Sequence, residues 1–294
     1  MADSHTQHPD TRLDSLLPPE MARRAEDVGV AKAGRSKRTL FALGVLAGAF
    51  IALGGVFATV ATTGAAGAPY GAVRILAGVA FSLGLMLVVV GGAELFTGNV
   101  LIVMAWASRR VSTRSLLRNW ALAYAGNFVG AAATALLVAL AATQHLGENG
   151  FGIATFKLAS AKLSLPFGQA LVRGILCNAL VCLAVWLTYS ARTTGDKLLA
   201  IVFPVAAFVA AGFEHSIANM YFVPFALFVN ALEPGFAAAA GVTTEAANLS
   251  VAGFVVRNLV PVTLGNIIGG AVLVGATYWF VYVGAHPERA TRKP

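Results

Sequence analysis

Long uncharged runs of apolar residues constrain this chain more than any other feature of its sequence. Residues 39–60, 119–143, 174–191 and 258–283 contain no Asp, Glu, Lys or Arg. A helix needs about 20 apolar residues to cross a bilayer core of about 30 Å. Only 12% of the chain is charged, whereas soluble domains carry about 25%. The sequence therefore predicts an all-α integral membrane protein.

Two further apolar runs are each interrupted near the middle by ionisable residues. Glu94 divides the stretch 75–108, which is too long for one simple crossing, and Glu214 with His215 divides 198–232. Each of these stretches is predicted to be a broken helix. They are the second and fifth crossings in the chain, and with the four uninterrupted runs the sequence predicts six transmembrane helices.

The positions of the basic residues predict the orientation in the membrane. Of the 21 Lys and Arg residues, 16 fall before the first predicted crossing, in alternate loops or in the tail. Basic loops stay cytoplasmic, so both termini are expected on the cytoplasmic side of the membrane. The predicted organisation is a cytoplasmic segment over 1–38, a channel domain over 39–285 and a tail over 286–294. Within the first segment, residues 14–32 predict an amphipathic helix at the cytoplasmic face, where a cytoplasmic partner could bind.

The two halves of the chain are related by an internal repeat. A shift of 120 residues places Gly92, Glu94 and Asn99 on Gly212, Glu214 and Asn219. A shift of 139 places four residues of the third crossing on four of the sixth, namely Asn119, Gly126, Asn127 and Gly130 on Asn258, Gly265, Asn266 and Gly269. An odd number of crossings per repeat inverts the second copy. The sequence therefore predicts two inverted three-helix repeats, with a solute path at their interface.

Three ionisable residues within the predicted membrane runs call for separate interpretations. We expect Glu94 and Glu214 to be structural, accepting hydrogen bonds from N–H groups freed at the helix breaks. His215 has no counterpart, since Leu95 occupies the matching position. Its ordinary pKa near 6.5 would allow proton exchange near neutral pH, although a buried structural histidine stays open as an alternative.

Two other polar residues are weaker candidates by themselves. Thr97 follows the first break and offers a hydroxyl at the depth where the two halves should meet, but threonine often bonds to its own helix. Lys162 lies in an expected loop over 144–165, where an exposed cation would concentrate anions at a pore mouth.

Several classes of function are disfavoured by the sequence. Seven of the 21 basic residues precede position 39, so the net charge of +8 is no evidence for nucleic-acid binding. Cys177 and Cys182 share one apolar run, and we expect neither a disulfide nor a metal site, nor any cofactor. An intramembrane hydrolase using Ser216 beside His215 is disfavoured because adjacent residues do not face each other as nucleophile and base. The chain is not expected to be an enzyme.

The phrases AELFTGNVLIV (93–103), ILCNALVCLAVW (175–186), GFEHSIANMYFVP (212–224) and NLVPVTLGNIIGG (258–270) resemble the formate/nitrite transporter family. The resemblance implies an aquaporin-like protomer, a homopentamer in the lipid bilayer and a pore for small monovalent anions in each protomer. It places Thr97 and His215 at the centre of the pore and Lys162 in the outer vestibule, which Asn266 faces. It puts Asn178 beside the histidine, Leu85, Leu95 and Phe96 at the cytoplasmic constriction, and Phe81 with Phe208 at the outer one. Gly98 and Asn99 depart from the small hydroxyl residues typical of the formate channels.

The resemblance implies bidirectional formate transport in which the central histidine relays a proton to the anion, so that a neutral acid crosses the apolar rings. The proton then either returns to His215 or travels with the solute. A nitrite or hydrosulfide channel, or a proton-coupled transporter of the same fold, is the alternative.

Overall fold

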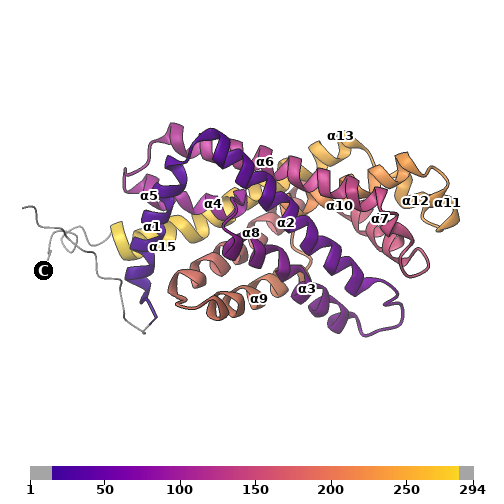
Figure 1. Ribbon diagram of the computed structural model, residues 1–294, viewed down its shortest axis with the longest axis horizontal. Coiled ribbons are helices and arrows are strands. Elements are labelled where there is room, and N and C mark those ends of the chain that lie inside the picture. The colour runs from indigo at the N-terminus through magenta and orange to yellow at the C-terminus, as the bar shows by residue number, and fades with distance from the viewer. Residues whose placement is uncertain (1–14, 285–294) are drawn as a thin grey trace, which may run out of the picture.

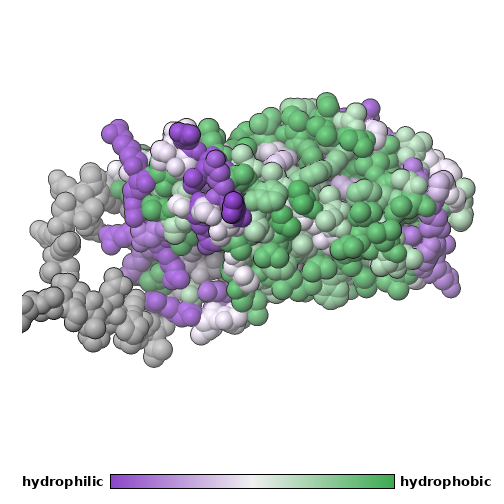
Figure 2. Space-filling model, turned by 45° about the horizontal axis from the view of Figure 1, so that its top comes forward, coloured by the Kyte–Doolittle hydropathy of each residue, from purple (hydrophilic) through white to green (hydrophobic). Residues whose placement is uncertain are grey.

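The computed structural model describes residues 15–284, and this part of the chain is helical without a strand. The amino-terminal positions before residue 15 and the predicted tail over 286–294 lie outside the described residues. Five helices are long and apolar enough to cross a membrane: α2 (Lys37–Thr62), α3 (Tyr70–Gly91), α6 (Thr113–Leu140), α8 (Phe167–Ser190) and the combined stretch Val251–Gly284. Figure 2 shows apolar residues across the middle of the visible face and hydrophilic residues gathered towards its two ends.

The remaining elements of the described chain are shorter. They are α1 (Pro18–Gly34), α4 (Phe96–Asn99), η1 (Val100–Ile102), α5 (Val103–Ala107), η2 (Thr143–His145), α7 (Gly150–Leu163), α9 (Thr194–Ala210), α10 (Ser216–Leu232), α11 (Phe236–Ala239) and α12 (Thr243–Ala247). The combined stretch Val251–Gly284 consists of α13 (Val251–Gly253), η3 (Phe254–Leu259), α14 (Val260–Ile267), η4 (Ile268–Ala276), α15 (Thr277–Trp279) and η5 (Phe280–Gly284).

Helical structure stops at both ionisable interruptions. After α3 ends at Gly91, the backbone is non-helical until α4 begins at Phe96. After α9 ends at Ala210, α10 begins at Ser216. Gly92 and Gly212 adopt φ values of +78° and +72°, a left-handed conformation that glycine enters without steric cost. The α9 and α10 segments, of 17 residues each, occupy the position of the predicted fifth crossing.

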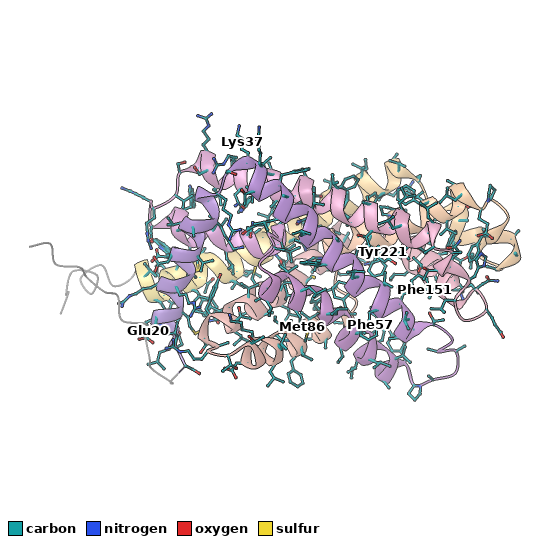
Figure 3. All side chains as sticks on the ribbon, viewed as in Figure 1. Glu20, Lys37, Phe57, Met86, Phe151 and Tyr221 are labelled. Carbon is teal, nitrogen blue, oxygen red and sulfur yellow. The ribbon has the colours of Figure 1, made fainter. Side chains whose placement is uncertain are left out.

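The repeat is visible in the packing of the long helices. An ideal Cβ on Gly130 of α6 would lie 1.9 Å from the carbonyl oxygen of Val45 on α2. An ideal Cβ on Gly269 would lie 2.0 Å from the carbonyl oxygen of Ile175 on α8. Each glycine therefore permits a close helix approach that alanine would prevent. Large side chains lie both inside the protein and on its surface. Tyr221 is fully buried, whereas Phe57 is 51% exposed (Figure 3).

The repeat also contains an element that the sequence analysis missed. Residues 144–165 were expected to form a loop, but α7 occupies most of this stretch, so that expectation is wrong. In the first half, α1 takes the corresponding place. The side-chain amide of Asn119 donates to the Lys32 carbonyl at the end of α1, and that of Asn258 donates to the Lys162 carbonyl at the end of α7.

The α1 helix lies at one end of the molecule beside α5 and α15, and α7, α11 and α12 lie towards the other end (Figure 1). The expectation of a helix within residues 14–32 agrees with α1, but its apolar face is covered by protein. Its buried residues are Met21, Ala22, Ala25, Glu26, Gly29 and Ala33.

Candidate functional site

Two cavities lie on either side of the helix breaks. The first, which we call the α7 cavity, has a volume of about 320 Å³, and its lining includes Phe81, Lys162, Phe208 and His215. The second, the α1 cavity, has a volume of about 200 Å³, and its lining includes Lys32, Arg35, Leu85, Glu94 and Leu95. Phe81 lines the α7 cavity and Leu85 the α1 cavity, and these residues lie one turn apart on α3, a rise of about 6 Å.

Apolar side chains separate the two cavities. The rings of Phe81 and Phe208 meet edge to face with their centroids 5.8 Å apart. Leu85 and Leu95 are buried at the end of the α1 cavity. The predicted constriction residue Phe96 lines neither cavity. Its ring packs instead against Tyr124, at a centroid distance of 5.0 Å, and against Trp120.

His215 and Thr97 are brought together between the two halves. His215 Nε2 lies 2.9 Å from Thr97 Oγ1, and its Nδ1 accepts a hydrogen bond of 3.1 Å from the Ala218 N–H. A ring nitrogen that accepts carries no proton, so the imidazole proton is on Nε2, which donates to Thr97. Both ring nitrogens are thus occupied by groups other than Ser216, which gives no support to a nucleophile–base pair.

Two buried asparagines satisfy the backbone at the breaks. Asn127 Oδ1 accepts from the Phe96 N–H at 2.9 Å, and Asn127 Nδ2 donates to the carbonyls of Gly44 and Glu94. Asn266 Oδ1 accepts from the Ser216 N–H at 2.9 Å. Its Nδ2 donates to the carbonyls of Gly174 and Glu214.

The asparagines therefore have the role predicted for the two glutamates, whose side chains accept no hydrogen bond from a backbone N–H group within residues 15–284. That prediction is wrong for a physical reason. An amide has both a donor and an acceptor and can bond to N–H and C=O groups at once, whereas a carboxylate only accepts. Asn266 thus holds the second break.

Each glutamate belongs instead to a cluster of side chains. Glu214 accepts from Lys162 Nζ at 2.9 Å and from Asn219 Nδ2 at 2.8 Å, and Asn219 also donates to Asn258 Oδ1. We call these four residues the α7 cluster.

The corresponding α1 cluster is formed by Lys32, Glu94, Asn99 and Asn119. Lys32 Nζ lies 3.1 Å from Glu94 Oε2, and Asn99 Nδ2 donates both to Glu94 and to Asn119 Oδ1. Burial lowers the pKa of the Lys32 ammonium, and the neighbouring Glu94 carboxylate acts in the opposite direction. Lys32 was not among the residues predicted from the sequence, although a shift of 130 residues places it on Lys162.

Lys162 is not the exposed cation that the sequence predicted. Its side chain is only 10% exposed and is paired with Glu214, while its ammonium lies 5.9 Å from the centre of the Phe222 ring. It still lines the α7 cavity. Within residues 15–284, Glu214 is the one hydrogen-bond acceptor of Lys162 Nζ, which leaves two of its three N–H groups for a ligand.

Asn178 lies on α8 and contacts the segment that carries Thr97. Its side-chain amide donates to the backbone carbonyl of Thr97 at 3.2 Å and to that of Asn266 at 2.6 Å, not to the histidine. Cys182 donates to the same Thr97 carbonyl at 3.3 Å. These contacts from α8 fix the segment that carries the Thr97 hydroxyl.

Comparison with known proteins gives consistent matches over most of the chain. The model of the formate/nitrite transporter family matches residues 19–280. The formate channel FocA of Escherichia coli K12 is 45% identical over 276 residues, covering 93% of this chain and 97% of the relative. A probable formate transporter of Methanothermobacter thermautotrophicus is 39% identical, covering 90% and 97%.

Solved structures give the same result. A pentameric formate channel with formate bound has a TM-score of 0.79 at 44% identity, covering 84% of this chain and 98% of that one. An ion channel of the same family has a TM-score of 0.76 at 26% identity, covering 89% and 98%.

The buried pair in the α7 cluster gives a testable prediction. Replacing Lys162 by Met leaves the Glu214 carboxylate buried without its cation, which should destabilise the protein by about 3–5 kcal/mol. The double variant Lys162→Met/Glu214→Gln should recover much of this loss because no charge is left unpaired. Denaturant unfolding of the purified protein measures both effects.

Lys157→Met is the matched control, since Lys157 is an exposed lysine of the same helix. If Lys162→Met unfolds like this control, and only anion flux at low ionic strength changes, Lys162 acts as a steering charge and the pair is not structural.

Proposed function

Because the chain belongs to the formate/nitrite transporter family, we propose that it carries formate and similar small monovalent anions across the bacterial inner membrane. Transport runs in either direction through a pore within each protomer. The observation that carries this proposal is the pair of cation-lined cavities on the two sides of a short apolar barrier, beside which His215 of the α7 cavity bonds to Thr97. Formate is the substrate favoured by the names of the relative from E. coli and of the solved channel.

The charges in the two cavities suit an anion. Lys162 lines the α7 cavity and Lys32 with Arg35 lines the α1 cavity. An anion that leaves water for an apolar constriction loses several kcal/mol of solvation. The nearby cations and the amino-terminal end of α10 at His215 offset part of this loss.

His215 supplies the hydrogen-bond donor at the barrier. Its Nε2–H, which contacts Thr97, can turn to an anion that arrives from the α7 cavity. To give a proton, the ring must first become an imidazolium with a proton on Nδ1. That proton displaces the bond from the Ala218 N–H, which caps α10, and losing such a cap costs about 0.5–2 kcal/mol.

The imidazolium then gives its Nε2 proton to a carboxylate oxygen of formate, forming neutral formic acid and leaving a neutral ring. The acid crosses the rings of Phe81 and Phe208 and the side chains of Leu85 and Leu95 without a buried charge. Return of the proton to His215 makes the net event anion conduction, and its departure with the solute makes it proton-coupled.

The assembly and orientation belong to the same proposal. The matching solved structure is a pentamer, and we propose a homopentamer in the lipid bilayer with both termini cytoplasmic. In that orientation α1 covers the cytoplasmic mouth, and the exposed side of this helix is available to a cytoplasmic partner. Val28, Lys32 and Arg35 line the α1 cavity from this side.

Flux into proteoliposomes tests the proposed substrate. Equal gradients of formate, nitrite and hydrosulfide should give the highest protein-dependent rate for formate, with protein-free vesicles correcting for leakage of the neutral acids. A formate rate equal to that of protein-free vesicles, beside clear nitrite or hydrosulfide flux, would assign the pore to one of those anions.

The proton relay gives a second prediction. In His215→Asn, the new side chain can still cap α10 but cannot exchange a proton, so flux should persist while its dependence on pH between about 5 and 8 is lost. Formate uptake across this range, with internal pH followed by a trapped dye, measures both quantities.

His145→Asn is the matched control, because His145 lies on η2 with its side chain 46% exposed. This variant should keep the wild-type pH profile. If a conducting His215→Asn protein kept the wild-type dependence of flux on pH, His215 would not relay a proton. It would then act only as a helix cap and hydrogen-bond donor.

A further inference from the structure

An arginine that the repeat does not explain binds the end of a broken helix. Arg74 lies on α3, and its guanidinium donates to the backbone carbonyls of Val209 and, at 3.2 Å, Ala210. These are the last two residues of α9 before the second break. Arg74 is partly buried and lines the α7 cavity.

The two breaks differ at this point. The nearest heavy atom to an ideal Cβ on Gly212 is Arg74 Nη2 at 3.6 Å, whereas a Cβ on the matching Gly92 would meet nothing within 4 Å. The shift of 120 residues that relates the two glycines places Thr194 opposite Arg74. Arg74 therefore occurs at the α7 cavity only, and it is not one of the residues that recur in both halves of the chain.

The electrostatics of a broken helix explain what this arginine does. The amino-terminal end of α10 borders the α7 cavity at His215 and Ala218. The carboxyl-terminal end of α9, which carries the partial negative charge of its last carbonyls, borders the same cavity at Val209. A helix end of this kind carries about half a negative charge. Left alone, it would oppose the entry of the anions that α10 and Lys162 attract. The Arg74 guanidinium covers these carbonyls and cancels their charge.

The same contact lies next to the apolar barrier. Phe208 immediately precedes Val209 and Ala210, whose carbonyls Arg74 binds. Phe81 lies seven residues after Arg74, two turns along the same face of α3. The α3 helix thus contacts the end of α9 at two levels, through the Phe81 ring and through the Arg74 guanidinium.

We propose that Arg74 is a positioning residue for anion transport. It favours the entry of anions into the α7 cavity because it neutralises the negative charge of the carbonyls at the end of α9. This inference rests on the proposed anion transport. It applies to any small monovalent anion, because the neutralised group is the backbone and not a substrate-specific contact.

Three variants separate the charge of Arg74 from its hydrogen bonds. Arg74→Lys keeps a cation that can reach the carbonyls, whereas Arg74→Gln keeps a donor without charge. Arg173→Gln is the control, because Arg173 lines the same cavity but is exposed. Formate permeability is measured in proteoliposomes at low formate concentration and at about 0.01 M and 1 M salt, where the screening length falls from about 30 Å to 3 Å.

Arg74→Gln should lower formate permeability by about threefold to tenfold at both salt concentrations, because the guanidinium contacts the carbonyls directly. Arg74→Lys should stay within about twofold of the wild type. Any effect of Arg173→Gln should disappear at high salt, since exposed charges are screened.

Two results would overturn the inference. Unchanged permeability in Arg74→Gln would show that the charge is unnecessary, and an equal loss in Arg74→Lys and Arg74→Gln would show that the geometry of the guanidinium matters and not its charge. Failure of the proposed function is a different result, because the wild-type protein itself would then show no formate flux.

Discussion

A helix that breaks inside a membrane exposes backbone groups that lipid cannot satisfy, and the arrangement of this protein depends on how that problem is solved. Each unsatisfied group costs several kcal/mol in an apolar environment. Asn127 and Asn266 solve it with single side-chain amides that bond to one N–H and two carbonyls each. Because these amides fix the starts of α4 and α10, they also fix the positions of Thr97 and His215.

The repeated frame and the features that depart from it have different roles. Asparagines, glutamates and lysines recur in both halves and hold the breaks and the helices α1 and α7. The residues placed at the barrier do not recur: His215 corresponds to Leu95, and Thr97 corresponds to Ile217. Arg74 likewise has no counterpart. The residues that recur in both halves therefore form the scaffold. The residues proposed to act on the anion, namely His215, Thr97 and Arg74, have no counterpart in the other half.

The sequence predicted the features that depend on local pattern. Uncharged runs located the membrane helices, and Glu94 with Glu214 marked the interruptions, because both signals lie within a few neighbouring residues. Hydrogen-bond partners were predicted less well, since Glu214 pairs with Lys162 from 52 residues away. The apolar neighbours of Lys162 within α7 were the available signal for its burial. Phe96 was placed at the constriction by resemblance alone, and its ring contacts could be seen only in the folded protein.

Hydrogen–deuterium exchange of the assembled protein tests the central claim most directly. In the wild type, the amides of Phe96 and Ser216 should exchange slowly although both follow non-helical segments. Asn266→Ala should accelerate exchange in residues 212–219 while leaving 92–99 protected, and Asn127→Ala should do the reverse. Rapid exchange at both positions in the wild type, or equal protection in all three proteins, would show that the two asparagines do not hold the breaks.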